Sequence, residues 1–514
     1  MASCANVADF LLEGQAPGAT ALRMLHGDHT YGELNRAVTQ VATSLVQTEP
    51  RGSRVLLIGE NSLFWVAAYL GTMKAGLICV PLPTSISAGE IDYILSLTGA
   101  RLAFVQSKVL LSHAREFAGV HVITDRCGPS VPGVASHRSF TEIESTTLRD
   151  GGFPVVETDD LAALMFTSGS TGRPRGVMVS HPNIIANTKS IIQYLGLTAN
   201  DRIMTVLPFH YCFGTSLLHT HLKAGASLVI DSRFLYPEAI LQRMADTECT
   251  GFAGVPSHFQ ILLRRSRLKK RSFPRLRYVQ QAGGHLAPVF VRELREALPR
   301  TQVFIMYGQT EGTARLSYLH PEFLESKAGS IGRGVPGVTL QVLNSEAMPV
   351  APGEVGEIVA EGENVARGYW RAPEDSAKCF REGKLYTGDL ATVDRDGFIY
   401  IVDRSKDFLK CGGVRVSSRQ LEEQVLECEG LLEAAVVGVP DEVLGEAVKA
   451  FVVPRESTCN GPCRWPDCRS AKDRVLRFCK EHLSPQFVPR EIVLLPVLPK
   501  NSAGKVIKAG LKEL

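Results

Sequence analysis

The sequence predicts an α/β protein: a large N-terminal domain of helix-flanked sheets with a small β-rich subdomain, followed by a small α+β domain at the C-terminus. Its 514 residues are too many for one ordinary hydrophobic core, so two or more domains are expected. Short β-branched runs alternate with helical patterns through the first part of the chain, which predicts parallel sheets covered by helices. After about Gly329 the pattern changes to short strands separated by Gly and Pro turns, which indicates the β-rich subdomain.

The alternating elements begin with a strand at residues 55–58 and a helix at 62–74, in which apolar residues recur at helical spacing. Further pairs of a strand and then a helix are expected at 202–207 and 216–223, 227–230 and 237–245, and 278–281 and 288–298, with one more strand at 303–306. The apolar stretch between Val55 and Leu82 contains Glu60, Asn61 and Lys74. Because a membrane span needs about 20 nearly uncharged residues, no transmembrane segment is expected.

The second part of the chain predicts two smaller units. Short strands are expected at 339–343, 356–361 and 397–402. Beyond them, a helix, two strands, a second helix and a last strand are expected at 420–428, 434–439, 447–453, 472–482 and 492–495. We therefore expect an N-terminal domain at residues 1–404, with its β-rich subdomain at about 330–404, and a C-terminal domain at 405–514.

Charge and cysteine content limit the class of protein. The chain has 56 Lys and Arg against 53 Asp and Glu, a formal charge of +3, so nothing requires a nucleic-acid partner. Most of the 12 cysteines are isolated among apolar neighbours, and the N-terminus has no basic start or long apolar run. These features predict reduced thiols in a cytoplasmic protein without a secretory signal.

The most irregular stretch of the chain contains Cys459, Cys463 and Cys468, and is followed by Cys479 and His482. A zinc site is conceivable there. The cysteine spacings miss the usual paired zinc motif, so an ordinary surface insertion is the favoured interpretation.

A loop rich in glycine and hydroxyl side chains is the strongest local signal. Its sequence, MFTSGSTGRPRGV at residues 165–177, lies between apolar strands expected at 161–166 and 176–180. Such a loop can wrap a polyphosphate, because its glycines allow close approach of the backbone and its hydroxyls can donate hydrogen bonds. Taken alone it is more often a flexible turn, and it lacks the Gly-Lys-Ser/Thr of the common nucleotide-triphosphate loop. The candidate phosphate-binding residues are Thr167, Ser168, Gly169, Ser170, Thr171, Gly172 and Arg175.

Further motifs follow this loop at wide intervals. They are Tyr307-Gly308-Gln309-Thr310-Glu311, Tyr386-Thr387-Gly388-Asp389, Asp403-Arg404 and the segment from Pro499 to Lys505. In this order and at these distances, the motifs resemble those of the adenylate-forming superfamily: acyl-CoA synthetases, peptide-synthetase adenylation domains and beetle luciferases. The resemblance covers essentially the whole chain. It implies activation of a carboxylic acid by ATP as an acyl adenylate, transfer of the acyl group to a thiol, and a mobile C-terminal domain.

The resemblance also implies roles for individual residues in nucleotide binding. Attack of a carboxylate on the α-phosphorus of ATP brings two anions together, so positive groups must offset their repulsion. Lys505 matches the mobile catalytic lysine that bridges the acid and the α-phosphate, and Glu311 matches the carboxylate that holds Mg²⁺. Thr310 would bind the α-phosphate, and Asp389 would accept hydrogen bonds from the ribose hydroxyls with Arg404 assisting. The other nucleotide-binding residues implied are Gly283, Gly284, His285, Tyr307, Gly308 and Gln309.

Two positions depart from the family pattern. Arg175 stands where relatives usually carry Lys, which keeps the charge but changes the shape of the donor. His285 follows Gly284 where relatives often have Ala or Glu, so its contact with the adenine stays open.

Gly283 and Gly284 match the strip beneath the adenine, and Tyr307 would stack on its face.

The acid pocket is predicted from the segment at 208–214. Amino-acid-activating relatives place an Asp in this segment to pair with the substrate ammonium, and this chain has no acidic residue there. An amino acid is therefore disfavoured, because its buried ammonium would have no partner. His210 resembles the gate residue of acyl- and aryl-acid ligases and completes the implied catalytic set with Lys505 and Arg404. The predicted walls, which suit a fatty or other hydrophobic acid, are Tyr211, Cys212, Phe213, Val255, Pro256 and Ala282.

The thiol acceptor is predicted from the segment at 410–415. Lys410, Gly412 and Gly413 resemble the loop that lines a pantetheine tunnel once the C-terminal domain has rotated, and Lys406 lies at the hinge position. Coenzyme A and the phosphopantetheine of an acyl carrier protein present the same arm, so both stay open, with coenzyme A favoured. The basic run at 264–271 could meet the phosphates of coenzyme A or an acidic carrier protein, although a solvated loop is the better interpretation.

Two functions of other classes are alternatives. A catalytically silent nucleotide- or acyl-binding protein is suggested by Arg175, but the presence of Lys505, Glu311 and Asp389 argues against it. A nicotinamide oxidoreductase would need a G-x-G-x-x-G turn after the first strand, and residues 58–62 lack that turn.

Overall fold

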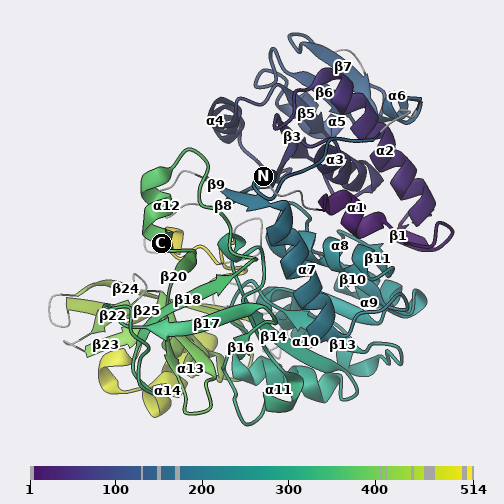
Figure 1. Cartoon of the computed structure of the whole chain (residues 1–514). Coiled ribbons are helices and arrows are strands. Elements are labelled where there is room, and N and C mark those ends of the chain that lie inside the picture. Colours follow the sequence, from purple (N-terminus) through teal and green to yellow (C-terminus); the bar gives the residue numbers. More distant parts are fainter. Residues whose placement is uncertain are drawn as a thin grey trace.

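The computed structural model describes residues 5–128, 131–147, 152–167, 174–404, 408–411, 414–441, 445–455, 469–500 and 506–511. Within these residues the chain forms two large mixed sheets, a smaller antiparallel sheet and a C-terminal sheet (Figure 1). The predicted α/β class, with a large N-terminal domain and a small C-terminal domain, is confirmed.

The first large sheet occupies the upper part of the view in Figure 1. Its order is β7 (Ser136–Ser139), β6 (His121–Thr124), β5 (Leu102–Val105), β3 (Arg54–Ile58), β4 (Ile78–Leu82), β8 (Leu161–Thr167) and β9 (Arg175–Ser180). Neighbouring strands are parallel except for β8 and β9, which form an antiparallel hairpin. The interior strands β3 and β4 are continuous apolar runs, as expected of parallel strands that are covered on both faces.

The second large sheet has its parallel strands in the middle and antiparallel pairs at its edges. Its order is β16 (Arg333–Gly334), β15 (Ser317–Leu319), β14 (Gln302–Tyr307), β13 (Tyr278–Gln281), β12 (Gly251–Gly254), β10 (Arg202–Thr205), β11 (Ser227–Ile230), β1 (Thr20–Met24) and β2 (Gly27–Thr30). The strands from β14 to β1 are parallel, so their carboxyl ends lie along one edge of the sheet. Ligands bind at such edges in α/β proteins.

Helices fill the space between and around these two sheets. Helix α3 (Leu63–Lys74) has no polar face, and residues 64–73 are all buried, as expected of a helix that is apolar all round. Its Tyr69 hydroxyl lies 3.0 Å from Nε2 of His219 on α8 (Cys212–Lys223), so one core joins elements of both sheets. The other helices of this part are α1 (Val7–Leu12), α2 (Tyr31–Thr48), α4 (Ala88–Thr98), α5 (Ser107–Ser112), α6 (Phe140–Glu144), α7 (His181–Leu195), α9 (Pro237–Asp246), α10 (Pro256–Arg265) and α11 (Pro288–Ala297).

The β-rich region forms an antiparallel sheet. Its order is β17 (Val338–Leu343), β18 (Gly356–Gly362), β20 (Lys384–Val393) and β19 (Phe380–Arg381), with β21 (Ile399–Arg404) also paired with β20, and α12 (Pro373–Cys379) precedes β19. Strand β20 pairs with β18, β19 and β21, yet the sequence analysis did not predict it. Its centre reads Thr387-Gly388-Asp389, which looks like a turn. Gly388 has φ of +74°, and the pairing with both β18 and β21 is irregular along this strand.

The C-terminal sheet lies beside the β-rich sheet in Figure 1. Its order is β23 (Val414–Ser417), β22 (Phe408–Cys411), β25 (Gly445–Pro454) and β24 (Leu431–Asp441), with β26 (Glu491–Leu494) on β25, and its helices are α13 (Ser418–Leu426) and α14 (Arg469–His482). Phe290 and Leu294 on α11 share one buried apolar cluster with Leu421 and Val425 on α13. The C-terminal domain is therefore docked on the nine-stranded sheet through this cluster.

Most of the predicted elements occur close to their predicted bounds, and one shift concerns the site. Helix α8 begins at Cys212 rather than at Ser216, because Tyr211 precedes it without a side-chain cap and leaves no signature in the sequence. Gly214 in its first turn is required by close packing, since a Cβ atom there would lie 2.1 Å from the Pro208 carbonyl oxygen. Cys212 and Phe213, predicted as walls of the acid pocket, thus stand in the first turn of a helix.

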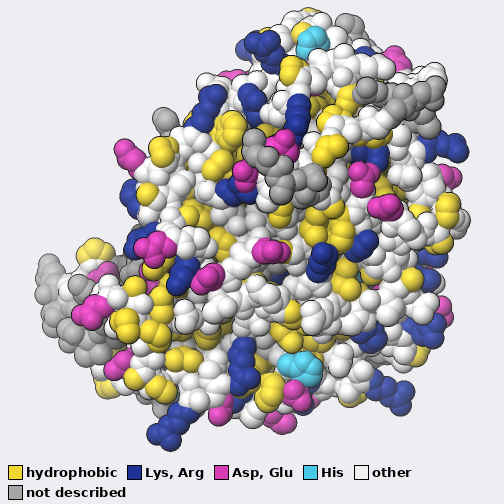
Figure 2. Space-filling view, in the orientation of Figure 1, with side chains coloured by type: hydrophobic (Ala, Val, Ile, Leu, Met, Phe, Trp, Pro, Cys, Tyr) yellow, Lys and Arg dark blue, Asp and Glu magenta, His cyan; other side chains and the backbone are white. Residues whose placement is uncertain are grey.

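Three further expectations can be compared with the structure. None of the helices in the described residues combines the length and the apolar character that a membrane span requires. Basic and acidic side chains are interspersed over the face shown in Figure 2, in line with the balanced charge. Cys459, Cys463 and Cys468 lie outside the described residues, within which no group of three or more His, Cys, Asp or Glu could hold a metal ion.

Candidate active site

A cavity of about 530 Å³ lies where the carboxyl ends of β12, β13 and β14 meet the β-rich sheet and the C-terminal domain. Its volume is within the range of about 300–1,000 Å³ that is usual for small-molecule sites. The predicted site residues that line it are Pro256, Gly283, Gly284, His285, Tyr307, Gly308, Gln309 and Asp389. A second, more open cleft of about 590 Å³ contains none of the predicted residues.

Asp389 is fixed at the cavity wall by contacts from three strands. It lies on β20 with 6% of its surface exposed, and Tyr307 Oη on β14 donates a hydrogen bond to Asp389 Oδ2 at 2.7 Å. The N–H of the preceding Gly388 donates to Glu357 Oε1 at 2.8 Å. Arg404 stands opposite Asp389 in the register of β20 and β21, and its side chain lies outside the described residues.

The two glycines predicted beneath the adenine pack tightly against the segment after β12. Gly283 has φ of +82°, and a Cβ atom there would lie 3.0 Å from Val255 Cγ1. A Cβ atom at Gly284 would lie 3.2 Å from Pro256 Cγ. These positions therefore require glycine for conformation or close approach, and both line the cavity.

Glu311 belongs to a chain of polar contacts that includes Arg175. Tyr369 Oη donates to Glu311 Oε1 at 2.8 Å, and burial together with the Glu311 charge raises the pKa of Tyr369, so the phenol stays protonated. The Arg175 guanidinium lies 5.4 Å from the centre of the Tyr369 ring and forms an ion pair of 2.9 Å with Asp375 on α12. Arg175 is therefore held beside Glu311 through Tyr369.

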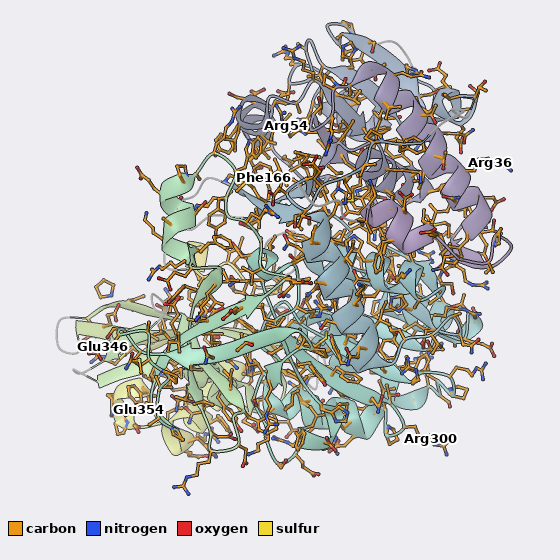
Figure 3. The ribbon with its side chains drawn as sticks, viewed as in Figure 1. Arg36, Arg54, Phe166, Arg300, Glu346 and Glu354 are labelled. Atoms are coloured by element: carbon orange, nitrogen blue, oxygen red, sulfur yellow. The ribbon has the colours of Figure 1, made fainter. Side chains whose placement is uncertain are left out.

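The predicted phosphate loop is the connection between β8 and β9. Thr167 and Arg175 face each other in the register of this hairpin, and Ser168, Gly169, Ser170, Thr171 and Gly172 lie outside the described residues. Phe166, at the end of β8, lies near the middle of the molecule in Figure 3. The two strands that flank the predicted loop therefore form a hairpin at one edge of the seven-stranded sheet.

The acid side of the site is closely packed. Thr310 Oγ1 donates to Cys212 Sγ at 3.5 Å, and both residues line a pocket of only about 20 Å³. His210 Nε2 is buried without a hydrogen-bond partner among the described residues, and burial lowers the pKa of His210 to about 4. The imidazole is therefore neutral at pH 7. The predicted residues His210, Tyr211, Phe213, Val255 and Ala282 line neither the large cavity nor this small pocket.

The C-terminal domain closes one side of the large cavity. Lys500 and Val506 pair across an antiparallel bridge, both line the cavity, and the Lys500 ammonium lies 2.7 Å from Glu433. The residues between them, including Lys505, lie outside the described residues, as do Lys406, Gly412 and Gly413. Lys410 is part of β22, and its side chain also lies outside them.

The chain matches one family over most of its length. The AMP-binding enzyme family matches residues 13–370, and the AMP-binding enzyme C-terminal domain matches residues 420–505. Feruloyl-CoA synthase of an Amycolatopsis species is 31% identical over 507 residues, which cover 97% of this chain and 96% of that protein. The chain belongs to the adenylate-forming superfamily.

Other members of the superfamily are similar over nearly their full length. Long-chain-fatty-acid–CoA ligase of Salmonella typhimurium is 29% identical over 494 residues, covering 90% of this chain and 85% of that protein. The structure of o-succinylbenzoate coenzyme A synthetase from Bacillus subtilis in complex with ATP and a magnesium ion has a TM-score of 0.82 and 25% identity, and the match covers 99% of each chain. This adenylate-forming enzyme is therefore an AMP-forming acid–thiol ligase.

His285, one of the departures from the superfamily pattern, contacts the C-terminal domain. Its Nδ1 lies 2.5 Å from Arg419 Nη2 and its Nε2 lies 2.6 Å from Glu423 Oε1, both on α13. Burial and the Arg419 charge lower the pKa of His285 to about 4, so the ring is neutral and its Nδ1 accepts from Arg419. In this adenylate-forming enzyme the imidazole thus joins the two domains beside the cavity.

Several residues at or beside the site of this adenylate-forming enzyme were not predicted from the sequence. Tyr369 and Asp375 hold Glu311 and Arg175, but both partners lie far away in the sequence, so no local pattern could identify them. Arg315 follows the Tyr307-to-Glu311 motif and has only 1% of its surface exposed. A charged residue in an apolar setting so close to a motif is a signal that could have singled it out.

Proposed function

We propose that this enzyme uses ATP and Mg²⁺ to convert a hydrophobic carboxylic acid into its acyl adenylate and then transfers the acyl group to the thiol of coenzyme A. The observation that carries the proposal is the cavity of about 530 Å³, in which motif residues of the nine-stranded sheet and the β-rich sheet meet the C-terminal domain. In the first step the acid oxygen attacks the α-phosphorus and pyrophosphate leaves. In the second step the thiolate attacks the acyl carbonyl carbon and AMP leaves.

For the nucleotide, we assign the ribose to Asp389 and the adenine to the wall formed by Gly283, Gly284 and Tyr307. The Tyr307 hydroxyl is engaged with Asp389, which fixes the plane of its ring in the cavity. The contact also supports the Asp389 carboxylate as an acceptor for the ribose hydroxyls. Arg404, opposite Asp389 on β21, is assigned to assist.

For Mg²⁺, the donor set around Glu311 is consistent with an ion that arrives with the nucleotide. Magnesium in nucleotide sites is bound by one or two carboxylates together with phosphate oxygens and water. Glu311 supplies such a carboxylate, and the described residues contain no larger cluster of acidic, His or Cys side chains that would form a metal site of its own. Thr310, next to it, is assigned to the α-phosphate, and Arg175 to the pyrophosphate.

For the acid, the contacts favour a substrate without an ammonium group. The buried His210 ring is neutral and cannot attract an anion by charge, so it acts as a polar neighbour of the carboxylate. The walls assigned from Tyr211 to Phe213 and from Val255, Pro256 and Ala282 carry no carboxylate that could pair with an amine. Relatives named for aromatic and for long-chain fatty acids match this chain almost equally well. The apolar part of the acid is therefore either aromatic or aliphatic.

For the acceptor, coenzyme A is favoured over a carrier protein because the relatives of this chain are named as CoA synthases and ligases. The basic run at 264–271 adds little support, since Arg264 and Lys269 both pair with Glu293, and Arg271 pairs with Glu238. We assign the domain boundary to residues 404 and 405, Lys406 to the hinge, and Lys410, Gly412 and Gly413 to the pantetheine tunnel.

Exchange of labelled pyrophosphate into ATP, measured over a panel of carboxylic acids, tests the first step. Hydrophobic acids should support exchange and the common amino acids should not. Thioester formation is then measured with coenzyme A and with a phosphopantetheinyl carrier protein in parallel. Robust exchange with an amino acid, or transfer to the carrier alone, would contradict the proposal.

A further inference from the structure

Arg315 is a buried arginine without a carboxylate partner among the described residues. Its surface is 1% exposed, and its guanidinium lies 4.2 Å from the centre of the Phe213 ring. Its Nη2 atom is buried and has no hydrogen-bond partner in the described part of the chain. Burying a charged group without a counterion is unfavourable, so an arginine in this setting indicates a ligand that supplies the missing charge.

Arg264 packs on a phenylalanine ring as Arg315 does, but it also has a carboxylate partner. Its guanidinium lies 4.3 Å from the Phe290 ring, much as Arg315 lies over Phe213. Arg264 Nη2 also contacts Glu293 Oε1 at 2.6 Å. Because the stacking on a phenylalanine ring is alike in the two cases, the difference is the carboxylate.

The surroundings of Arg315 contain a second hydrogen-bond donor that has only a weak acceptor. Arg315 Nε lies 3.3 Å from Met306 Sδ, and Tyr194 Oη donates to the same sulfur at 3.0 Å. A thioether sulfur is a weak acceptor, whereas a guanidinium and a phenol are strong donors. Two strong donors thus converge on one weak acceptor, at a place where a carboxylate could accept from both. Met306 is an unbranched, adaptable side chain that can move aside for a ligand.

The backbone before Arg315 is held in an uncommon conformation. Thr313 and Ala314 have φ of 50° and 92°, respectively. The Arg315 carbonyl accepts from Asn187 Nδ2 at 3.0 Å and from Asn364 Nδ2 at 2.9 Å. Residues with positive φ other than glycine cost about 1–3 kcal/mol each and persist where the surroundings fix them, often at ligand sites. The chain is therefore held so that the residue at 315 enters the site.

The position of Arg315 connects it with the acid rather than with the nucleotide. Phe213, over which it lies, is a predicted wall of the acid pocket and adjoins Cys212, which contacts Thr310. Met306 lines the large cavity, so the guanidinium lies one side chain behind the cavity wall. From this geometry we infer that Arg315 binds a second carboxylate at the far end of the substrate, which makes the substrate a dicarboxylic acid with an apolar centre.

The inference rests on the proposed function and narrows its substrate class. A planar guanidinium can hold a carboxylate through two parallel hydrogen bonds, and the Tyr194 hydroxyl can add a third. The same positive charge repels an α-ammonium group, which gives a second reason why amino acids are disfavoured.

A matched series of acids tests the inference. Initial rates of pyrophosphate exchange are measured for α,ω-dicarboxylic acids of increasing chain length, for their monomethyl esters and for monocarboxylic acids of the same length. For the preferred length, kcat/KM of the diacid should exceed that of its monoester by about 10- to 100-fold, the range expected for a charged hydrogen bond. Arg315→Met should remove this preference by raising KM for the diacid while kcat changes little.

Two further variants separate this role from a purely structural one. Tyr194→Phe should lose a smaller part of the diacid preference. Arg264→Met, which removes a largely buried arginine that does not line the cavity, should leave the preference unchanged. The inference is overturned if the wild type prefers monoacids, or if Arg315→Met slows exchange equally with every acid.

The failure of the proposed function is distinguishable from the failure of this inference. If no acid supports exchange, the proposed function fails, and calorimetric binding of the diacid to wild type and Arg315→Met still decides the inference. Tighter binding of the diacid to wild type, by about 10-fold or more, would support it. Equal binding to both proteins would overturn it.

Discussion

The proposed nucleotide end and the proposed acid end of the site differ in how their charged and titratable groups are partnered. At the nucleotide end the Asp389 carboxylate accepts from Tyr307, and the Glu311 carboxylate accepts from Tyr369. Arg175 is paired with Asp375. Each of these groups has a protein partner that holds it in position before any ligand arrives.

At the acid end the corresponding groups are buried but lack such partners in the described part of the chain. His210 has a nitrogen without a hydrogen bond, and Arg315 has one as well. The large cavity reaches the nucleotide end, whereas the acid end is filled by packed side chains. The part of the site that we assign to ATP is therefore prearranged by protein contacts, whereas the part that we assign to the acid has buried polar groups that a ligand would have to satisfy.

The largest expected effect is at the prearranged end. Glu311→Ala should slow adenylation about 100- to 1,000-fold and raise the magnesium requirement, because the ion would lose its protein carboxylate. Pyrophosphate exchange at increasing magnesium concentrations measures both effects. Tyr369→Phe keeps the carboxylate and removes only its donor, so it should cost about 10-fold or less. An unchanged magnesium dependence in Glu311→Ala would show that the ion is held elsewhere.

A smaller effect is expected from breaking the Asp389 contact. Tyr307→Phe keeps the ring and removes the hydroxyl that donates to Asp389, so KM for ATP should rise about 10-fold. KM for the acid should stay the same, because the two ends are partnered independently. Steady-state kinetics with each substrate varied in turn measures the two constants. A rise in KM for both ATP and the acid would contradict the independent partnering of the two ends.

The acid end should also make the protein sensitive to low pH. Burial lowers the pKa of His210 from 6.5 to about 4, so the folded protein keeps the ring neutral where the unfolded chain takes up a proton. Stability is therefore fully present above pH 6.5 and is lost as the pH falls toward 4. His210→Phe should reduce the loss of unfolding free energy between pH 7 and pH 5 by about 1–2 kcal/mol.

Denaturant unfolding of both proteins at the two pH values provides the measurement. Other buried histidines with lowered pKa values contribute to the same trend in both proteins and cancel in the difference. An identical pH dependence in wild type and His210→Phe would mean that His210 is not held neutral by the fold.

The smallest expected effect compares two buried arginines in the free protein. Arg315→Met removes a charge without a carboxylate partner and should leave the unfolding free energy unchanged or raise it by about 1 kcal/mol. Arg264→Met leaves the largely buried Glu293 without its Arg264 partner. This substitution should lower the unfolding free energy by about 1–3 kcal/mol. Thermal unfolding without ligands measures both. A strong destabilisation by Arg315→Met would mean that the protein itself satisfies this charge.

Local patterns in the sequence predicted the fold because strand and helix periodicities are local properties. The strand over residues 227–230 and the helix that starts at Pro237 occur where expected. Residues of two motifs, Tyr307 to Gln309 and Asp389, line one cavity, which lies at the carboxyl ends of parallel strands of the nine-stranded sheet. The roles assigned to the site residues stay predictions until they are measured.

What the sequence could not predict depends on contacts between distant segments. Strand β20 was missed because its Thr-Gly-Asp centre looks like a turn, and only pairing with strands on both sides makes it extended. Tyr369 and Asp375 take their roles from partners on other elements. The position of Arg315 next to a motif could have singled it out, but its contacts with Phe213, Met306 and Tyr194 come from distant or separate elements and could not be predicted from the sequence around it.

The close approach of Gly308 and Ala314 has a consequence for how enzymes of this kind can diversify. A Cβ atom at Gly308 would lie 2.0 Å from the Ala314 carbonyl oxygen, so any side chain there would displace the loop that follows the motif. The side chain at 315, in contrast, is attached to a backbone held by Asn187 and Asn364 and can be exchanged without moving that loop. If Arg315 binds the acid as we infer, descendants of a common ancestor can acquire new acid preferences through single codon changes at this position, without a change in the loop that follows the motif.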